Sequence, residues 1–340
     1  MGVLTAYKGM EPLSGQIEDY PDGIILPIDK PWRWTSADVI RKVKFAAVRH
    51  FHKKNLKVGH AGTLDPLATG VLLVCIGKAT KLAEELQRHD KEYVAGVCFG
   101  ATTPSYDLEK EIDRFYPWEH IDEAAVRAVL PGFLGEQEQV APLFSAKSVD
   151  GVRAYELARK RYGEALRDGT DFDHDLAGLL SRQRIRIDEI ELLSFTPGIA
   201  PAVPPESGSA PYPDALPEAV SFAPSARQTG SSVSRGGQTE LSGQPVDREH
   251  LHPLTDEATS RKPGRNADNR IHVTDNSALG LPRADIRVAC TKGTYIRALA
   301  RDLGEAVGSG AHLDALRRTR SGGFRVEDVL SVEDALRLLS

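Results

Sequence analysis

The residues of this 340-residue chain that are best suited to catalysis lie in one string, GHAGTLDPLATG at residues 59–70. Three glycines and a proline among its twelve residues favour a tight, rigid loop, because glycine permits positive φ and proline fixes its own φ. Asp65 stands directly before Pro66, a place that drives a residue to an extended conformation. A bare Leu-Asp-Pro triplet is more typical of a turn aspartate that bonds its own backbone. The whole string is more specific, and it predicts a carboxylate on a fixed support.

The sequence does not predict a metal site, a disulfide bond or a membrane-spanning helix. The cysteines Cys75, Cys98 and Cys290 lie far apart in apolar runs without C-x-x-C spacing, which indicates buried thiols in a reducing compartment. His50 and His52 are close together, but they lie in a basic segment that suits phosphate better than zinc. The longest apolar run is far shorter than the roughly 20 residues of a membrane-spanning helix, and the N-terminus shows no targeting pattern. We therefore expect no metal, no cofactor and a cytoplasmic protein.

Mixed helices and strands must position the carboxylate. Val- and Ile-rich runs bounded by Gly, Pro or Asp predict strands at Ile24–Ile28, Val71–Ile76, Tyr93–Phe99, Arg184–Phe195 and Ile286–Cys290. Apolar spacing and capping residues predict helices at Ala37–Phe51, Ala79–Arg88, Ile121–Val129, Arg153–Tyr162, Tyr295–Val307 and Val332–Leu339. Because strands and helices do not alternate strictly, the predicted class is α+β rather than doubly wound α/β.

Composition divides the chain. Residues 198–282 hold 11 of the 21 prolines, with 8 glycines and 10 serines but only two aromatic residues. Such a segment cannot bury enough apolar surface to offset its ordering entropy, so we expect a disordered insertion. The predicted organisation is an N-terminal extension at 1–22 and a catalytic domain in two parts, 23–197 and 283–340, around that insertion. Because the flanking strands would pair as an antiparallel hairpin, the insertion should leave the fold intact.

Charge is unevenly placed. The net charge of −5 argues against a generic nucleic-acid coat. Residues 39–60, however, hold seven Lys or Arg and no acid, and residues 283–325 hold nine against four. A single basic run is most often a solvated helix face. Two such runs on either side of one candidate site favour a phosphate-binding surface.

The string around Asp65 resembles the catalytic loop G-[TA]-L-D-P-x-A-x-G of the TruB family of tRNA pseudouridine synthases, relatives of dyskerin. Further similar blocks are GIILPIDKP at 23–31 with Thr35-Ser36, DKEY at 90–93 with FGATT at 99–103 and Asp107, PLFSAK at 142–147 with Gly151, Arg153 and Tyr155, CTKGTYIR at 290–297, and GAHL at 310–313 with LRR at 316–318. The resemblance covers 23–197 and 283–339. It implies the pseudouridine synthase fold, a large, mixed and mainly antiparallel sheet flanked by helices.

The resemblance implies isomerisation of a uridine, in which the N1–C1′ bond breaks and C5 joins C1′ without net redox change. It assigns Asp65 as the essential carboxylate, which attacks covalently or stabilises a cationic sugar. Attack at C6, attack at C1′ and a glycal route all stay open. Arg297 matches the family arginine that pairs with this aspartate, and a buried carboxylate needs such a cation to stay ionised. Judged alone, Arg297 would be read as a solvent-exposed residue.

A pocket for a uracil flipped out of its RNA stack is also implied. Tyr93 matches the tyrosine that lies against the base and helps remove the C5 proton, although a lone tyrosine is usually a core residue. His60 matches the histidine that occupies the space left by the flipped base. The predicted substrate-binding set is completed by Tyr295, Leu316, Lys292, Arg317 and Arg318. The Lys30-Pro31 pair is expected to support the loop from beneath without a catalytic role.

The implied substrate is tRNA, contacted at its T-loop and stem, with the uridine at position 55 as the target. We expect a monomer that needs no protein partner. No segment resembles the C-terminal PUA domain of most bacterial relatives, so the two basic segments or the insertion would have to grip the tRNA. The alternatives are the same chemistry on another RNA and a non-catalytic RNA-binding or chaperone module. The presence of Asp65, Tyr93 and Arg297 together argues against a module that has lost its catalytic activity.

Overall fold

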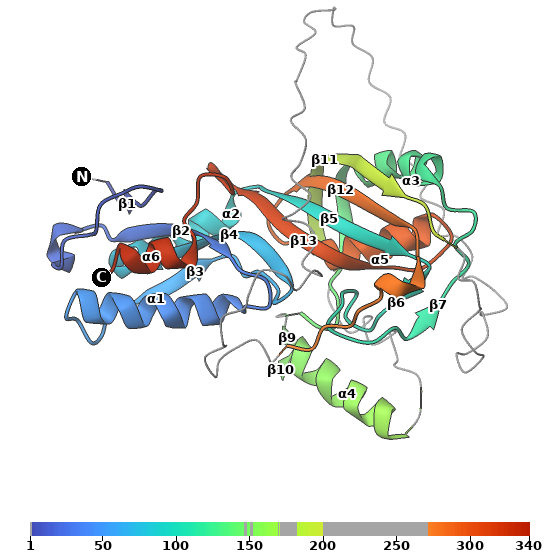
Figure 1. Ribbon diagram of the computed structural model, residues 1–340, viewed down its shortest axis with the longest axis horizontal. Coiled ribbons are helices and arrows are strands. Elements are labelled where there is room, and N and C mark those ends of the chain that lie inside the picture. The colour runs from blue at the N-terminus through green and yellow to red at the C-terminus, as the bar shows by residue number, and fades with distance from the viewer. Residues whose placement is uncertain (1, 146–147, 150–151, 169, 171–181, 200–270) are drawn as a thin grey trace, which may run out of the picture.

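The computed structural model describes residues 2–145, 148–149, 152–168, 170, 182–199 and 271–340 (Figure 1). Within these residues the expected α+β class is confirmed, because a mixed ten-stranded sheet carries helices on its faces. Residues 200–270 of the expected insertion lie outside the described residues, as do Ala146, Lys147 and Gly151 of the fourth family-like block. No helix in the described part is long and apolar enough to cross a membrane.

Every predicted strand is present, with ends that shift by a few residues. The predicted helices are present as well, but the first part of Ala79–Arg88 is a 3-10 helix, and the helix predicted at Arg153–Tyr162 extends to Asp168. The strands are β1 (Leu4–Thr5), β2 (Ile24–Lys30), β3 (Val58–Ala61), β4 (Ala68–Ile76), β5 (Lys91–Phe99), β6 (Ala101–Thr102), β7 (Arg114–Phe115), β8 (Gly135–Val140), β9 (Ser148–Val149), β10 (Val152–Arg153), β11 (Arg182–Thr196), β12 (Arg283–Cys290), β13 (Ala311–Ser321) and β14 (Phe324–Arg325). The α-helices are α1 (Ser36–His50), α2 (Ala83–Arg88), α3 (Glu123–Val129), α4 (Ala154–Asp168), α5 (Ile296–Ala306) and α6 (Val332–Arg337). Short 3-10 helices lie at Ile17–Asp19, Gly77–Leu82, Leu130–Phe133 and Ser277–Leu279.

The large sheet has the strand order β1-β2-β4-β13-β5-β12-β11-β8, with β3 paired to β4 and β14 paired to β13. Its pairings are antiparallel except for β1 with β2 and β4 with β13. Leu192 of β11 stands opposite Ile286 of β12, which confirms that the strands flanking the insertion pair as an antiparallel hairpin.

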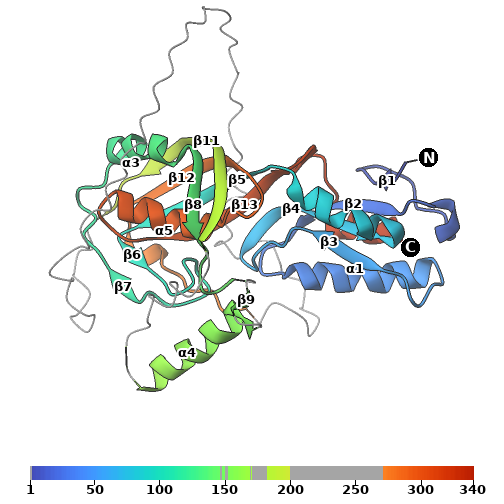
Figure 2. The same ribbon diagram turned by 180° about the vertical axis from the view of Figure 1, so that it is seen from behind.

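The molecule has two lobes that share this sheet (Figures 1 and 2). One lobe holds β2, β3 and β4 with α1 and α6, and the other holds β5, β11 and β12 with α3 and α5. The lobes join where β4 and β13 run in parallel over the pairs Leu316–Ala68, Arg317–Thr69 and Arg318–Gly70, which we call the seam. Gly70 has a φ of +101°, and a Cβ there would lie 2.2 Å from the Arg318 carbonyl oxygen, so the seam requires glycine.

A single apolar core cluster runs through both lobes. It includes Leu26 and Leu72 in one lobe and Phe99, Ile286 and Leu299 in the other. Alternate side chains of the central strands point into this core, as the period of a strand requires. The buried face of α5 covers the sheet beside the seam, which brings the beginning of α5 to the junction of the lobes.

The start of α1 is fixed by its own sequence. The Thr35 hydroxyl accepts a hydrogen bond from the Asp38 backbone N–H at 3.0 Å, and the Asp38 carboxylate accepts one from the Thr35 N–H, also at 3.0 Å. This reciprocal capping box satisfies two backbone donors that a helix start leaves unpaired. The predicted helix therefore begins at a defined residue, next to Ser36.

Several features differ from the sequence-based expectation. The strand β13 was not predicted, because the charged run around Arg317 and Arg318 hides the alternation typical of strands. Its place in the middle of the sheet, between β4 and β5, comes from partners far away in the chain. In addition, residues 59–61 belong to β3, so the catalytic-type loop is shorter than the predicted string and covers residues 62–67.

The C-terminal boundary of the expected insertion also shifts. Residues 271–276, which we call the strap, contact the body of the protein and therefore do not belong to a disordered segment. The Thr274 N–H donates to the Leu108 carbonyl oxygen at 2.9 Å, and the Ile271 carbonyl accepts from the Arg33 guanidinium at 3.1 Å. Prolines and serines dominate the insertion as a whole, and that average concealed this segment, which contains neither.

Candidate active site

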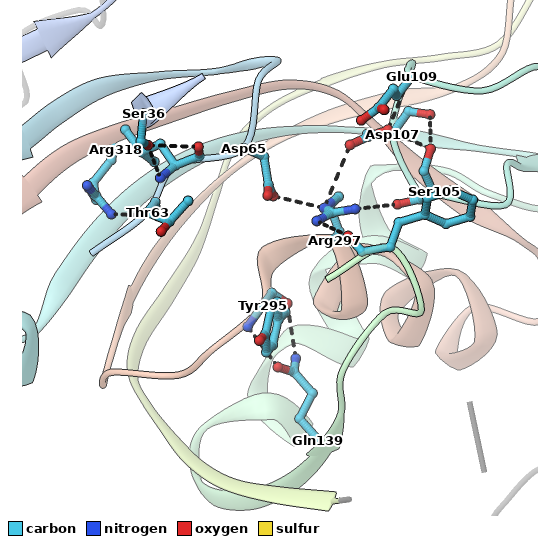
Figure 3. A network of polar contacts seen from close by, with 12 residues as sticks. Ser36, Thr63, Asp65, Ser105, Asp107, Glu109, Gln139, Tyr295, Arg297 and Arg318 are labelled. Atoms are coloured by element: carbon cyan, nitrogen blue, oxygen red, sulfur yellow. Dashed lines mark hydrogen bonds and ion pairs between the residues drawn. The ribbon is translucent and has the colours of Figure 1, made fainter. Parts of the chain in front are cut away.

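The loop 62–67 presents Asp65 at the seam. Two buried side chains fasten this loop on either side of the aspartate. The Ser36 hydroxyl donates to the Leu64 carbonyl oxygen at 3.1 Å and accepts from the Leu64 N–H at 3.0 Å (Figure 3). The Lys30 ammonium donates to the Pro66 carbonyl oxygen at 3.2 Å. The carboxylate therefore stands on a support that both α1 and β2 hold in place.

Arg297, at the beginning of α5, pairs with this carboxylate (Figure 3). Its Nε donates to Asp65 Oδ2 at 2.9 Å, and the exposed fractions of the two side chains are 5% for the arginine and 36% for the aspartate. Its Nη1 donates to the Ser105 carbonyl oxygen and its Nη2 to the Phe144 carbonyl oxygen, both at 3.0 Å. All three nitrogens of the guanidinium are thus engaged, which fixes its plane while Asp65 stays open to solvent.

A second carboxylate, Asp107, lies behind the pair. Its Oδ2 is 3.7 Å from Arg297 Nε, and its Oδ1 accepts from the Ser105 hydroxyl at 2.6 Å and from the Glu109 N–H at 3.0 Å. Burial raises the pKa of Asp107 to about 6, and the Arg297 charge opposes that rise. Sequence analysis gave Asp107 no role. The serine two positions before it is typical of a carboxylate held in a hydrogen-bonded turn, and that signal could have found it.

One guanidinium therefore faces two carboxylates of different exposure. Burial lowers the pKa of Arg297. The charges of Asp65 and Asp107 raise it by more, so the pKa of the arginine lies above its ordinary value. Arg297 consequently stays charged at every accessible pH. The buried Asp107 helps to hold the guanidinium, so the exposed Asp65 can react without releasing it.

A pocket opens beside this cluster. Its lining consists of the polar residues Asp65, Asp107, Arg297 and Asp314 and the apolar residues Leu67, Ala68, Leu313, Ala315 and Leu316. Leu316 thus lies at the site, where the sequence places it. Apolar walls with a few fixed polar groups are typical of a small-molecule or base pocket.

The two tyrosines of the predicted site, Tyr93 and Tyr295, do not line this pocket. Tyr93 on β5 is 9% exposed, belongs to the main core cluster and stands opposite Arg318 in the register with β13. Tyr295 directly precedes α5, and its backbone exchanges two hydrogen bonds with the Gln139 side chain, at 2.9 and 3.2 Å. Burial raises the pKa of both phenols, and the Asp65 charge adds to the rise. Both are therefore protonated at neutral pH.

The predicted pair Arg317 and Arg318 points to different surroundings. Arg318 is 1% exposed and donates to the carbonyl oxygens of Val71 at 2.7 Å and Gly62 at 3.1 Å, so it holds the loop from inside. Arg317 is bound to Asp29, with Nη2 2.7 Å from Oδ2. Both side chains thus brace the seam.

His60 and Lys292 complete the predicted set. His60 is half-buried on β3, and burial lowers its pKa, with a further contribution from Arg318, so the ring is neutral near pH 7. Its Nδ1 has no hydrogen-bond partner within the described part of the chain. Lys292 is exposed in the turn between β12 and α5. No cluster of three metal-ligating side chains occurs among the described residues.

Lys30 supports the loop, as expected. It is fully buried, and besides Pro66 its ammonium donates to the carbonyl oxygens of Pro31 at 2.8 Å and Trp34 at 2.5 Å. Burial lowers the pKa of Lys30 to about 7, and the nearby Asp65 charge opposes that shift. Its three acceptors join the segment before α1 to the loop that carries Asp65.

Comparisons with known proteins agree on one family. Residues 49–170 match the N-terminal domain of TruB family pseudouridylate synthases, and residues 297–339 match the C-terminal domain of tRNA pseudouridylate synthase B. The chain is 40% identical over 315 residues to a tRNA pseudouridine synthase B from Phocaeicola vulgatus, which covers 93% of this chain and 92% of that one. It is 36% identical over 307 residues to the protein of the same name from Thermus thermophilus, covering 90% of this chain and 75% of that one.

Among solved structures, the chain is similar to one in a Cbf5–Nop10–Gar1 complex, with a TM-score of 0.48 and 21% identity, over 99% of this chain and 65% of that one. It is also similar to a chain in an H/ACA RNP bound to a substrate RNA containing 2′-deoxyuridine. There the TM-score is 0.46 and the identity 20%, over 97% of this chain and 58% of that one.

Proposed function

The chain belongs to the TruB family of pseudouridylate synthases, and from that premise we propose that it converts the T-loop uridine at position 55 of tRNA to pseudouridine, with Asp65 as the reacting carboxylate. The protein is thus an isomerase that acts on tRNA. In this reaction the N1–C1′ bond breaks, the uracil turns, and the C5–C1′ bond forms. The proton on C5 leaves and N1 gains one, so no oxidant, reductant or energy donor is needed.

The observation that carries the proposal is the pairing of a half-exposed carboxylate with a buried guanidinium in a pocket. Asp65 can approach a base or sugar from its open side while its Oδ2 stays bound to Arg297 at 2.9 Å. A carboxylate in that setting can form a covalent bond or stabilise a cationic sugar. The loop fasteners Ser36 and Lys30 keep it at a constant position, which is what a reacting group needs.

The apolar part of the pocket supports binding of a flipped base. Leu67 and Leu316 offer apolar walls, and Tyr93 belongs to the neighbouring core cluster. Because Tyr93 is protonated at neutral pH, it can help remove the C5 proton only if its own proton leaves toward another acceptor. The charge of Arg318 lowers the pKa of Tyr93 and so favours that step.

The basic residues at the end of α1 support a grip on the RNA backbone. Lys44, Lys54 and Lys57 are exposed and line a surface hollow at the beginning of β3, the strand that leads to the loop of Asp65. Phosphates of the T-stem suit such a surface. Asp65, Arg297 and Asp107 all come from one chain, which supports action as a monomer, and we place that action in the cytoplasm.

Unmodified tRNA provides the test. Wild-type protein is incubated with it, and pseudouridine is mapped by carbodiimide-blocked primer extension. We expect a stop one nucleotide to the 3′ side of position 55, and this stop should disappear when the uridine at position 55 is replaced by cytidine. The variant Asp65→Asn, which keeps the shape but loses the charge, should bind the tRNA and form no pseudouridine.

Each other outcome points elsewhere. Modification at a different uridine or in a different RNA would refute position 55 of tRNA as the target, but the proposed isomerisation reaction would stand. Binding without any pseudouridine would favour a non-catalytic RNA-binding module. Release of free uracil would indicate a nucleoside hydrolase.

A further inference from the structure

The segment Pro31–Thr35, which joins β2 to α1, lies against the catalytic loop. The Lys30 ammonium bonds the carbonyl oxygens of both Trp34 and Pro66, and the Ser36 hydroxyl bonds both polar backbone groups of Leu64. These contacts fall on either side of Asp65 in the chain. The backbone of this segment therefore lies next to the loop that carries Asp65.

Arg33 in this segment has an uncommon backbone conformation. Its φ of +61° lies in the left-handed region, which residues other than glycine seldom adopt and which clusters at functional sites. Its guanidinium lies over the ring of Trp32, with 5.5 Å from Cζ to the ring centroid, and donates to the Ile271 carbonyl oxygen of the strap at 3.1 Å. The conformation is thus held from two sides, and it places the guanidinium over the tryptophan ring.

The two tryptophans of the segment differ. Trp34 packs against the main core, and Lys42 of α1 lies 5.7 Å from its ring centroid. Trp32 is half-buried and belongs to none of the apolar core clusters of the described residues. Within the described residues, packing in these clusters therefore accounts for Trp34 but not for Trp32.

We propose that the Trp32–Arg33 pair is a stacking site for an unpaired nucleobase next to the flipped uridine in the RNA substrate. An aromatic ring and a guanidinium plane are the two surfaces on which proteins stack splayed bases, and both are present in one fixed pair. The guanidinium and the nearby exposed Lys42 supply the positive charge that the phosphates of such a nucleotide require. This inference rests on the proposed function, since it needs an RNA whose target base leaves the stack.

A thermodynamic cycle tests the stacking. A series of T-arm hairpins carries one abasic nucleotide at a time in the loop, and their dissociation constants are measured with wild-type protein and with Trp32→Ala. For the wild type we expect an abasic site at one neighbour of the target uridine to weaken binding about tenfold. With Trp32→Ala the same abasic site should have no further effect, whereas Trp32→Phe should retain part of it.

The matched control is Phe45, which carries a similar pair but faces solvent on α1. Its ring is 67% exposed, and Arg49 Cζ lies 5.6 Å from its centroid. The effect of Phe45→Ala should add to that of every abasic site. Strict additivity for Trp32→Ala at all loop positions would overturn the proposal, and so would equal coupling for Phe45→Ala. Absence of pseudouridine with the wild type would instead refute the proposed function, because the binding cycle does not depend on turnover.

Discussion

At the scale of single residues, the site depends on how one guanidinium divides its hydrogen bonds. Each nitrogen of Arg297 reaches a different segment, at Asp65, Ser105 and Phe144. Lysine would carry the same charge but offers no planar fork that could meet three acceptors in fixed directions. Geometry, and not charge alone, is what this position provides.

The variant Arg297→Lys should therefore lose activity although it keeps the charge. We expect single-turnover pseudouridine formation to fall about 100-fold, as when a preorganised donor is removed from a reacting group. A rate within threefold of the wild type would show that charge alone suffices. Circular dichroism of the variant, compared with that of Asp65→Asn, checks that the fold is retained.

Asp107 should give the reaction a pH dependence. Its pKa is raised to about 6, so below that pH it is protonated and no longer balances the charge of Arg297. With deprotonated Asp107 as the active form, the rate at pH 5 should be about tenfold below that at pH 7. In Asp107→Asn, whose amide does not titrate, the maximal rate should be lower and this acid limb should be absent. If the rate of the variant fell at acid pH as the wild-type rate does, the titrating group would be a residue other than Asp107.

The same carboxyl affects stability with a defined sign. Its folded-state pKa lies above the ordinary value of 3.8, so the folded state binds the proton more tightly than the unfolded state does. The contribution of this group to stability is thus fully present below about pH 4 and is lost as the pH rises through about 6. Urea unfolding of the wild type and Asp107→Asn at pH 5 and pH 7 measures the difference.

At the scale of elements, the sequence predicted what local pattern determines. Strands such as Tyr93–Phe99 follow from short apolar runs bounded by turn-forming residues. The capped start of α1 follows from Thr35 with Asp38. The strand β13 could not be read in the same way, because its Arg318 is buried among carbonyl acceptors that other elements supply. A charged residue inside a strand is understandable only once those partners are known.

The seam makes Gly70 sensitive to substitution. In Gly70→Ala the new Cβ would meet the Arg318 backbone, so we expect a loss of about 3 kcal/mol in the free energy of unfolding. Gly163→Ala is the matched control, because Gly163 lies in α4 and a Cβ there meets nothing within 4 Å. That change should stabilise the protein by up to about 1 kcal/mol. Equal effects in urea titrations would contradict the role given to the seam.

The strap should influence the site through the segment that carries Asp107. Thr274→Pro removes the N–H that bonds the Leu108 carbonyl, whereas Thr274→Ala keeps this N–H and loses only the hydroxyl and the γ-methyl group of the side chain. We therefore expect turnover to fall several-fold more in the proline variant than in the alanine variant. Equal turnover in both variants would show that the strap does not position Asp107.

At the scale of the whole molecule, the site unites segments that are far apart in the chain. The Asp65–Arg297 pair joins residues separated by 232 positions, and Asp107 approaches from a third segment. The family-like motifs predicted the first two partners. They could not predict that Asp107 shares the guanidinium or that Arg318 faces inward, because both facts depend on how β5, β13 and α5 are packed.

The strand order predicts how a cut chain behaves. A protease site placed within residues 200–270 would separate β12 and β13 from the first eleven strands. Because β12 lies between β5 and β11, and β13 between β4 and β5, the two fragments should remain associated without a covalent link. We expect the cut protein to elute as one species in gel filtration and to keep modifying tRNA. Separation of the fragments without denaturant would contradict this expectation.

The central position of β13 has a consequence for how the protein is made. A ribosome produces Asp65 232 positions before Arg297, and the strand that fills the middle of the sheet emerges after Arg297. Until then β4 and β5 expose unpaired edges to each other, and the carboxylate has no cation beside it. Growing chains should therefore be inactive and dependent on protection of those edges, and competence for catalysis should appear in a single late step.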